Sequence, residues 1–470
     1  MVEQTYNPDK KKWLIPWVVA IAMFMETLDS TIVGVAIPRI ADSFSINPVD
    51  LKLALTSYLL SLAVFIPISG WLADKYGEKK IFILALSVFT LSSLLCGTAT
   101  NLLFLIIARL IQGFGGALMV PVGRLMLMRV FTKQEMVRAI AIMVVPGLVG
   151  PALGPTIGGL ILQVASWHWI FLVNIPFGIM GIIVAYILLP KTPQLIDINP
   201  FNWLGFLLFS AGLTLLTAAM AVLGDNFSLV KYALLLAAVS AVFLFLYGWV
   251  SARQRSPLLD LTLFKQKTFM VSMAVNFFAR IAIGAVPFLI PLLLQLVWGR
   301  SALFSGVMFM FLALGMMSSR IVLNQKVLSL FSFKTFLLVS TLLLSFLSMN
   351  LCWFSQPTSS FLLAALLFII GMLTTQVYMC FGILYRFELN ATQYSQAASI
   401  ASTIQQFSAG TGIAIAAVIL HLLSKLMSWP LFSSEVFFWT FIMINCFGFI
   451  SVIFVGQLDP GLRFEEEGSK

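Results

Sequence analysis

Two carboxylates in the sequence lie inside an otherwise apolar stretch. Glu26 and Asp29 are three residues apart, so a helix would place both side chains on one face. Three arginines, Arg109, Arg280 and Arg320, lie in similarly apolar surroundings. A charge in the middle of a membrane-spanning helix costs at least about 2.5 kcal/mol to insert, so residues retained there are functional candidates. These five residues predict proton transfer or recognition of a charged ligand.

Two interpretations of the acidic pair are open. In the first, Asp29, together with Glu26, takes up a proton on one side of a membrane and releases it on the other. In the second, Asp29 forms a static ion pair with an intramembrane arginine and does not titrate. Glu26 has the further alternative of contacting a cationic ligand. Arg109 and Arg280 are either partners of these carboxylates or groups that bind an anion.

The sequence offers few residues for disulfides, metal binding, catalysis or nucleotide binding. The four cysteines lie far apart without CxxC spacing, which argues against both a disulfide framework and a zinc site. The two histidines, His168 and His421, are too few for a metal site or a catalytic constellation. No phosphate-binding GxxxxGK[ST] loop occurs. We therefore expect no enzyme, no metal and no cofactor, and any active transport would draw on an ion gradient.

The elements that hold the charged residues are expected to be membrane-spanning helices. Of the 470 residues, 60% are hydrophobic and only 10% are charged, compared with about 25% charged in soluble proteins. A bilayer core of roughly 30 Å requires about 20 apolar residues per helix. We count about fourteen such runs, at residues 13–37, 51–71, 81–98, 102–121, 136–164, 170–189, 201–223, 232–250, 269–297, 303–323, 335–354, 361–384, 397–424 and 436–455. The sequence thus predicts an all-α integral membrane protein in contact with the lipid bilayer.

The basic residues predict the orientation. With the N-terminus in the cytoplasm, 20 of the 28 basic residues are cytoplasmic, among them Arg124; five are external, among them Lys52; and three are intramembrane. This bias follows the positive-inside rule and favours an N-in, C-in arrangement. It also accounts for the net charge of +10 without a nucleic-acid partner. The first run is longer than the apolar core of a signal peptide and carries two acids, so we interpret it as a spanning helix.

Two segments combine glycine or proline with regular spacing. Residues 70–80 read GWLADKYGEKK, which alone indicates a positively charged cytoplasmic loop with turn glycines. Residues 147–159 carry small residues and prolines, namely Gly147, Gly150, Pro151, Gly154, Pro155, Gly158 and Gly159. Small residues four apart permit close helix contact, and prolines permit bending, so this pattern alone favours a packing stripe on a helix that tilts or kinks.

Four motifs together resemble the major facilitator superfamily and, within it, the fourteen-helix drug:proton antiporters. Residues 70–80 resemble the GxLaDrxGrkxxl loop of that family. Residues 28–38, LDSTIVGVAIP, resemble LDxTIVNVALP, with Gly34 in place of asparagine. Residues 109–117, RLIQGFGGA, resemble RxxQGxGgA, and residues 147–159 resemble GxxxGPxxGG. The likeness is closest to enterobacterial inner-membrane members.

The resemblance implies a fold, a location and an activity. We expect an N-terminal six-helix bundle at 1–190, two additional helices and a connector at 191–262, and a C-terminal six-helix bundle with its tail at 263–470. The added helices carry no intramembrane charge and are expected to be peripheral. The implied activity is export of amphiphilic small molecules by a monomer in a bacterial inner membrane, driven by the proton gradient through alternating access.

The resemblance also implies roles for single residues. Asp29, Glu26 and Arg109 would couple protons. Asp74 would help to gate the rocking motion, within the loop that also carries Gly70, Gly77, Lys79 and Lys80. The second copy of this loop is expected after the tenth span, but residues 327–334 read VLSLFSFK and contain neither acid nor glycine. The C-terminal half is therefore expected to lack the matching latch.

Several polar residues and two alternative functions remain. Polar side chains within the spans line a cavity or form interhelical hydrogen bonds, of which we favour the latter: Gln112, Asn276, Gln295, Gln376 and Gln405. One alternative function is a dedicated metabolite or siderophore carrier in which Arg280 and Arg320 recognise an anionic group. The other, less favoured, is a transporter-like membrane sensor that binds a ligand without moving it.

Overall fold

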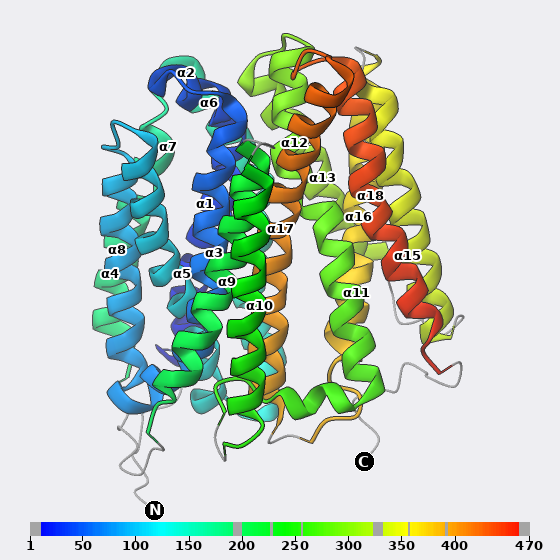
Figure 1. Cartoon of the computed structure of the whole chain (residues 1–470). Helices are drawn as coiled ribbons and strands as arrows, with labels where there is room; N and C mark the ends of the chain where they lie inside the picture. The colour runs from blue at the N-terminus through cyan, green and yellow to red at the C-terminus, as the bar shows by residue number, and fades with distance from the viewer. Residues whose placement is uncertain are drawn as a thin grey trace, which may run out of the picture.

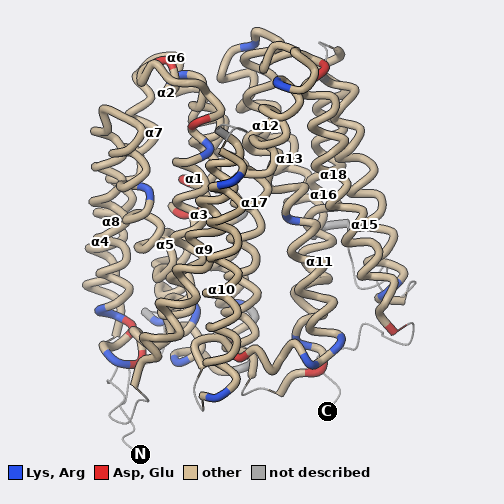
Figure 2. Tube along the Cα trace, viewed as in Figure 1, with Lys and Arg blue, Asp and Glu red and all other residues tan. Residues whose placement is uncertain are grey.

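The computed structural model describes residues 11–190, 200–225, 229–254, 257–322, 332–355, 358–390 and 393–459, and this part of the chain is helical (Figure 1). Fourteen of its helical segments are long and apolar enough to cross a membrane, as the sequence predicts. Lysines and arginines gather at the end where α1 begins (Figure 2). We call this the terminal end and the opposite one the far end; the positive-inside prediction assigns the terminal end to the cytoplasm.

The N-terminal bundle comprises the elements up to residue 188. Its segments are η1 (Lys11–Leu14), α1 (Ile15–Ile32), η2 (Val33–Ala36), α2 (Ile37–Phe44), η3 (Pro48–Leu51), α3 (Lys52–Tyr76), α4 (Glu78–Cys96), α5 (Leu102–Val130), α6 (Lys133–Val164), α7 (Trp169–Leu172) and α8 (Asn174–Leu188). Local sequence explains several of these boundaries. Asn101 accepts a hydrogen bond from the Phe104 amide and caps α5, and Thr132 and Glu135 form a capping box at the start of α6.

The inserted helices and the C-terminal bundle follow. Their segments are α9 (Trp203–Asp225), α10 (Val230–Ser251), η5 (Leu261–Lys265), α11 (Lys267–Gly284), α12 (Val286–Leu292), η6 (Leu293–Val297), α13 (Ala302–Val322), α15 (Phe333–Met349), η7 (Asn350–Ser355), α16 (Ser360–Leu384), α17 (Tyr394–Met427) and α18 (Ser434–Gly456). The two bundles lie side by side in Figure 1. They meet where α3 packs against α17 and α6 packs against α13.

The structure corrects some details of the predicted spans. The first span continues beyond residue 37 to Phe44, through the 3₁₀ turn Val33–Ala36. Helix α6 is a single helix across its prolines. Lys52 was counted as external and Arg124 as cytoplasmic, but Lys52 is buried at the start of α3 and Arg124 lies within α5. Apolar runs locate helices well, whereas long polar side chains near their ends shift the predicted boundaries.

The far end is closed by contacts between the bundles. Gln295 donates from Nε2 to the carbonyl oxygen of Val35 over 3.0 Å. Thr156 donates from Oγ1 to the carbonyl oxygen of Gly306 over 3.2 Å. Each of these bonds joins the N-terminal bundle to the C-terminal one near the far ends of the helices. A solute between the bundles is therefore sealed off from the far side in this conformation.

Gly34 contributes to the same closure. A Cβ atom at this position would lie 2.6 Å from the carbonyl oxygen of Pro287, which is closer than real Cβ contacts allow. The motif that residues 28–38 resemble has asparagine here. The substitution by glycine is explained by the close approach of α12 to the turn Val33–Ala36.

The terminal end is open between the bundles. Arg124 is exposed although it lies within the long helix α5. Its guanidinium is within electrostatic range of Glu26 in α1 and of Tyr385 and Arg386, which follow α16. A solvent-accessible side chain that faces residues of both bundles lies in a water-accessible space between them. The molecule is thus closed at the far end and accessible from the terminal end.

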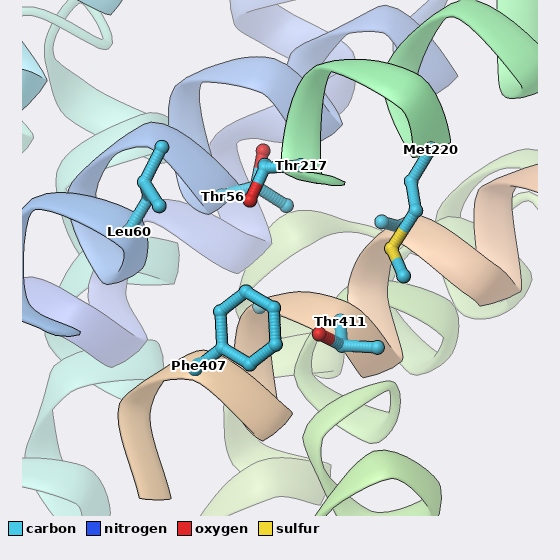
Figure 3. Close-up of a pocket in the computed structure, with 8 residues that line it drawn as sticks. Thr56, Leu60, Thr217, Met220, Phe407 and Thr411 are labelled. Atoms are coloured by element: carbon cyan, nitrogen blue, oxygen red, sulfur yellow. The ribbon is translucent and has the colours of Figure 1, made fainter. Parts of the chain in front are cut away.

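The inserted helices differ from each other in their surroundings. Helix α10 packs mainly on α9, and most of its side chains face outward, as expected of a peripheral helix. Helix α9 packs on α3 and on α17, so it covers the junction of the two bundles. A small pocket lies between these three helices (Figure 3), and its labelled lining residues are Thr56, Leu60, Thr217, Met220, Phe407 and Thr411. Most side chains of α9 also face outward, so α9 is a peripheral helix that in addition covers the junction.

Close packing of α13 on α16 leads to a stability prediction. A Cβ at Gly371 would collide with the carbonyl oxygen of Leu312, whereas a Cβ at Gly382 in the same helix would meet nothing within 4 Å. We expect Gly371→Ala to lower the free energy of unfolding by about 1–3 kcal/mol through overpacking. Gly382→Ala should leave it unchanged or raise it slightly, because alanine favours a helix over glycine. Thermal unfolding in detergent, followed by tryptophan fluorescence, compares them; equal melting temperatures would contradict this packing.

Candidate functional site

Asp29 lies at the centre of a buried polar network. Its side chain is 0% exposed, and that of Arg109 is 1% exposed. The Nη1 atom of Arg109 lies 2.5 Å from Oδ2 of Asp29. The other oxygen, Oδ1, accepts hydrogen bonds from the amides of Gln112 and Asn174, each over 2.9 Å. Helices α1, α5 and α8 thus meet at one carboxylate, and each of these contacts comes from an N–H donor.

Arg109 extends this network to α3 and α4. Its Nη1 atom donates to Oε1 of Gln112 over 2.6 Å, and its guanidinium lies 4.1 Å from the ring centroid of Tyr58. Gln112 also donates to Oγ of Ser93 in α4 over 2.8 Å. Arg109 and Gln112 share a helix face because they are three residues apart. Gln112 was a cavity candidate, but it is fully buried here and forms interhelical hydrogen bonds instead.

The glycines of the same motif bring the neighbouring helices into reach. A Cβ at Gly113 would lie 2.7 Å from the carbonyl oxygen of Tyr58 in α3. A Cβ at Gly115 would lie 2.8 Å from the amide nitrogen of Phe89 in α4. The backbone of α5 therefore approaches both helices closely, as small residues in membrane helices allow. This approach lets short side chains such as Ser93 reach the network.

Glu26 has a different environment from Asp29, although it lies one helical turn away. Its side chain is partly exposed, and it has no hydrogen bond or ion pair within the described residues. Its electrostatic neighbours are Arg124 and Asp29. In this conformation Asp29 is therefore held in an ion pair with Arg109, a contact that both interpretations of the sequence allow. Glu26 is the partly exposed carboxylate of the two.

Sequence reasoning assigned no role to Asn174, Ser93 or Tyr58. Asn174 is fully buried and binds Asp29 directly. The ring of Tyr58 lies against the guanidinium of Arg109, and its hydroxyl is buried without a hydrogen-bond partner in the described part of the chain. A lone asparagine at the start of an apolar helix is a usable signal for Asn174. Nothing in the sequence marks Tyr58 or Ser93, because such residues are common in membrane helices.

The loop 70–80 forms an ion-pair cluster with α5 at the terminal end. Arg129 contacts Asp74 through Nη2 and Glu78 through Nη1, each over 2.6 Å. Gly77 has φ +86°, which suits glycine and reverses the chain between α3 and α4. Asp74 therefore contacts an arginine of a neighbouring helix, as the resemblance implies, and Glu78 is an additional member.

The remaining members of this loop have separate surroundings. Lys79 donates from Nζ to the carbonyl oxygens of Tyr186 and Leu189, each over 2.7 Å, and so ties the loop to the end of α8. Lys80 is exposed. A Cβ at Gly70 would meet nothing within 4 Å, so close packing does not explain this glycine in the present conformation.

The small-residue stripe of α6 packs against two helices. The members that face α1 are Gly147, Gly150, Gly154 and Gly158, and Gly159 faces Leu303 at the start of α13. The carbonyl oxygen of Pro155 meets Gly306 of α13, and Pro151 lies in the same continuous helix. The geometry agrees with the packing interpretation of this motif. Because α13 belongs to the other bundle, the stripe also joins the two bundles.

The C-terminal candidates do not form one cluster. Gln376 accepts a hydrogen bond from Ser340 over 3.2 Å, which is an interhelical contact. Arg280 donates from Nε to Oδ1 of Asn276 over 2.8 Å. The side chain of Arg320 lies outside the described residues, as does most of the segment 327–334. Among the residues that the structure describes, no group of three His, Cys, Asp or Glu side chains is arranged to hold a metal ion.

Comparisons with known proteins agree with this arrangement. Residues 19–413 match the family model described as Major Facilitator Superfamily. This chain belongs to the major facilitator superfamily. It is 37% identical over 416 residues to the "Putative multidrug resistance protein MdtD" of Escherichia coli O6:H1, covering 88% of this chain and 87% of that protein. A protein of the same name from Shigella sonnei is 37% identical over 419 residues, covering 89% and 88%.

Solved structures show the same fold at low sequence identity. A bacterial homologue of the human lysosomal transporter Spinster, in an inward-facing and occupied conformation, matches with a TM-score of 0.68 at 12% identity and covers 98% of this chain and 100% of its own. A D-xylose–proton symporter matches with a TM-score of 0.67 at 13% identity, covering 93% and 97%. The chain is therefore a multi-pass membrane transporter of the major facilitator fold and not an enzyme.

The buried ion pair leads to a second stability prediction. Arg109→Gln leaves the carboxylate of Asp29 buried without its counter-charge, so we expect a loss of about 3–5 kcal/mol in the free energy of unfolding. The double variant Asp29→Asn with Arg109→Gln should lose clearly less, because no unpaired charge remains. Arg300→Gln, at an exposed position, serves as the control. Thermal unfolding in detergent measures all three; a loss in the double variant as large as that in Arg109→Gln would contradict the pairing.

Proposed function

We propose that this chain exports amphiphilic small molecules in exchange for protons by alternating access. The observation that carries the proposal is the contrast between the two carboxylates of α1. Asp29 is buried and paired with Arg109, and Glu26 one turn away is reached by solvent between the bundles. An acid that is paired in one conformation and reached by protons in another can couple proton movement to the rocking of the bundles. The family membership and the relatives' printed name support the same assignment.

The proposed cycle uses Arg109 as a replacement for the proton on Asp29. In the conformation open to the far end, Asp29 is protonated from outside. In the conformation described here Arg109, Gln112 and Asn174 contact the carboxylate, and Arg109 takes the place of the proton, which leaves towards the terminal end. Substrate enters the same space, with Glu26 available to a cationic group. The inward proton gradient thereby drives efflux.

The ion-pair cluster of Arg129 with Asp74 and Glu78 is proposed to gate this motion. It joins the loop after α3 to the end of α5 at the terminal end, where the bundles are apart. Rocking changes the position of these helix ends relative to the other bundle. We further propose that the transporter works as a monomer in the inner membrane of a bacterium, with the proton gradient as its energy source.

Proton movement in proteoliposomes tests the coupling. Vesicles carrying an imposed pH gradient and an internal pH dye are mixed with ethidium, an amphiphilic cation. We expect ethidium to evoke proton flux with the parent protein, and Asp29→Asn to reduce it to the level of protein-free vesicles because the carrier carboxylate is gone. Glu26→Gln should weaken the response to the cation. Asp42→Asn, which removes an exposed acid at the far end of the same span, is the matched control and should retain the flux.

Two outcomes would overturn parts of this proposal. Absence of flux with ethidium and related cations, in protein that unfolds cooperatively on heating, would contradict export of such drugs. Flux that persists in Asp29→Asn would contradict the assignment of the coupling carboxylate.

A further inference from the structure

Arg280 is a membrane-embedded cation that the proposed proton pathway does not use. It lies in the middle of the span Lys267–Val297, and its side chain is partly exposed. A cation at this depth is costly and usually pairs with an opposite charge. Within the described residues Arg280 has no carboxylate partner, and its hydrogen bond goes to the neutral side chain of Asn276. The charge is therefore not compensated by the parts of the protein that the structure describes.

The acidic residues of this bundle do not approach Arg280. Within the described part they lie at helix ends or in connecting segments, at Asp260, Glu388, Glu435 and Asp459. Glu26 of the other bundle has Arg124 and Asp29 as its electrostatic neighbours. In this respect Arg280 differs from Arg109, which has its own buried carboxylate.

The side chains around Arg280 hold its guanidinium in a fixed orientation. Its Cζ atom lies 3.8 Å from the ring centroid of Tyr378 in α16. Its Nε atom donates to Oδ1 of Asn276 over 2.8 Å, one helical turn away in α11. Stacking and hydrogen bonding leave the terminal Nη groups without partners in the described residues. A guanidinium fixed in this way presents the fork geometry that suits carboxylate, sulfonate or phosphate oxygens.

Asn276 supplies a second unused donor at the same place. Its side chain is 2% exposed, and its Nδ2 atom is buried without a hydrogen-bond partner in the described part of the chain. A buried donor left without a partner is costly in a native structure and calls for an explanation. Because Oδ1 of the same amide binds Arg280, the free Nδ2 group is next to the guanidinium. The two side chains together form a small cluster of donors without an acceptor.

We propose that Arg280, Asn276 and Tyr378 form a binding site for an anionic group of the transported molecule. This inference rests on the proposed transport of amphiphiles and adds a second class to the cationic one that Glu26 can contact: an apolar body that carries a carboxylate, sulfonate or phosphate. Arg280 and the amide of Asn276 donate hydrogen bonds to the anion, and Tyr378 holds the guanidinium in place from its ring face. Helices α11 and α16 supply the site, so it belongs to the C-terminal bundle and is separate from the carboxylates of α1.

Equilibrium binding of three ligands that share a naphthylmethyl body and carry an anionic, a cationic or a neutral polar group tests the site. The full chain in phosphatidylcholine nanodiscs is titrated calorimetrically with 1-naphthylacetate, 1-naphthylmethylammonium and 1-naphthylacetamide. We expect the anion to bind the parent more tightly than the neutral amide. Arg280→Gln should weaken binding of the anion by about tenfold or more, because a charge-assisted hydrogen bond is lost. Binding of the cation should not weaken in this variant.

Two further variants separate recognition from a structural role. Asn276→Asp places a carboxylate beside Arg280, so it should abolish binding of the anion while it supplies the missing counter-charge and maintains the fold. Arg300→Gln is the matched control, since Arg300 also lies over an aromatic ring, that of Phe304, but at an exposed position. It should bind all three ligands as the parent does.

The outcomes are distinct from those of the proton-flux experiment, because binding requires no proton movement. The site is overturned if the parent binds the anion no more tightly than the amide. The proposed site is equally contradicted if Arg280→Gln and Arg300→Gln weaken binding of the anion to the same extent. It is also contradicted if Asn276→Asp still binds the anion. Anion binding without coupled flux would leave the site standing and contradict the proposed coupling.

Discussion

The structure depends on one buried ion pair, that of Asp29 with Arg109. A carboxylate in this setting is tolerated only with a counter-charge and a full set of donors, and Arg109, Gln112 and Asn174 supply them from α5 and α8. The relative positions of three helices are therefore set by one side chain. Any conformation that separates α1 from α5 must neutralise Asp29 in another way, and a proton is the smallest group that does so.

Close backbone contact is the second constraint, and it follows from the first. Ser93 of α4 reaches Gln112, and Tyr58 of α3 lies against Arg109, because the glycines of α5 bring α3 and α4 near. The stripe of α6 brings α1 near in the same way. The opposite face of that stripe packs on α13 of the other bundle, so the same helix serves the charge network and the junction of the bundles. Helix α9 covers the other junction, between α3 and α17.

The intramembrane charges fall into two groups by accessibility. Asp29 and Arg109 neutralise each other out of reach of solvent, whereas Glu26, Arg124 and Arg280 are solvent accessible in the conformation open at the terminal end. Burial without pairing is costly, so the accessible charges are retained where water or a ligand can solvate them. This division agrees with the proposed roles, in which the paired charges couple the conformations and the accessible ones contact solutes.

The sequence alone determined the fourteen spans, the family and the residues that carry charge in the membrane, because apolar run length and the cost of buried charge leave a direct mark on composition. It also indicated that Glu26 and Asp29 share a helix face. Only the tertiary structure decided that Asp29 is paired while Glu26 is not, that Gln112 is buried, and that α9 lies on the junction of the bundles. Those outcomes depend on which helices pack together, and helical periodicity within one segment contains no information about its neighbours.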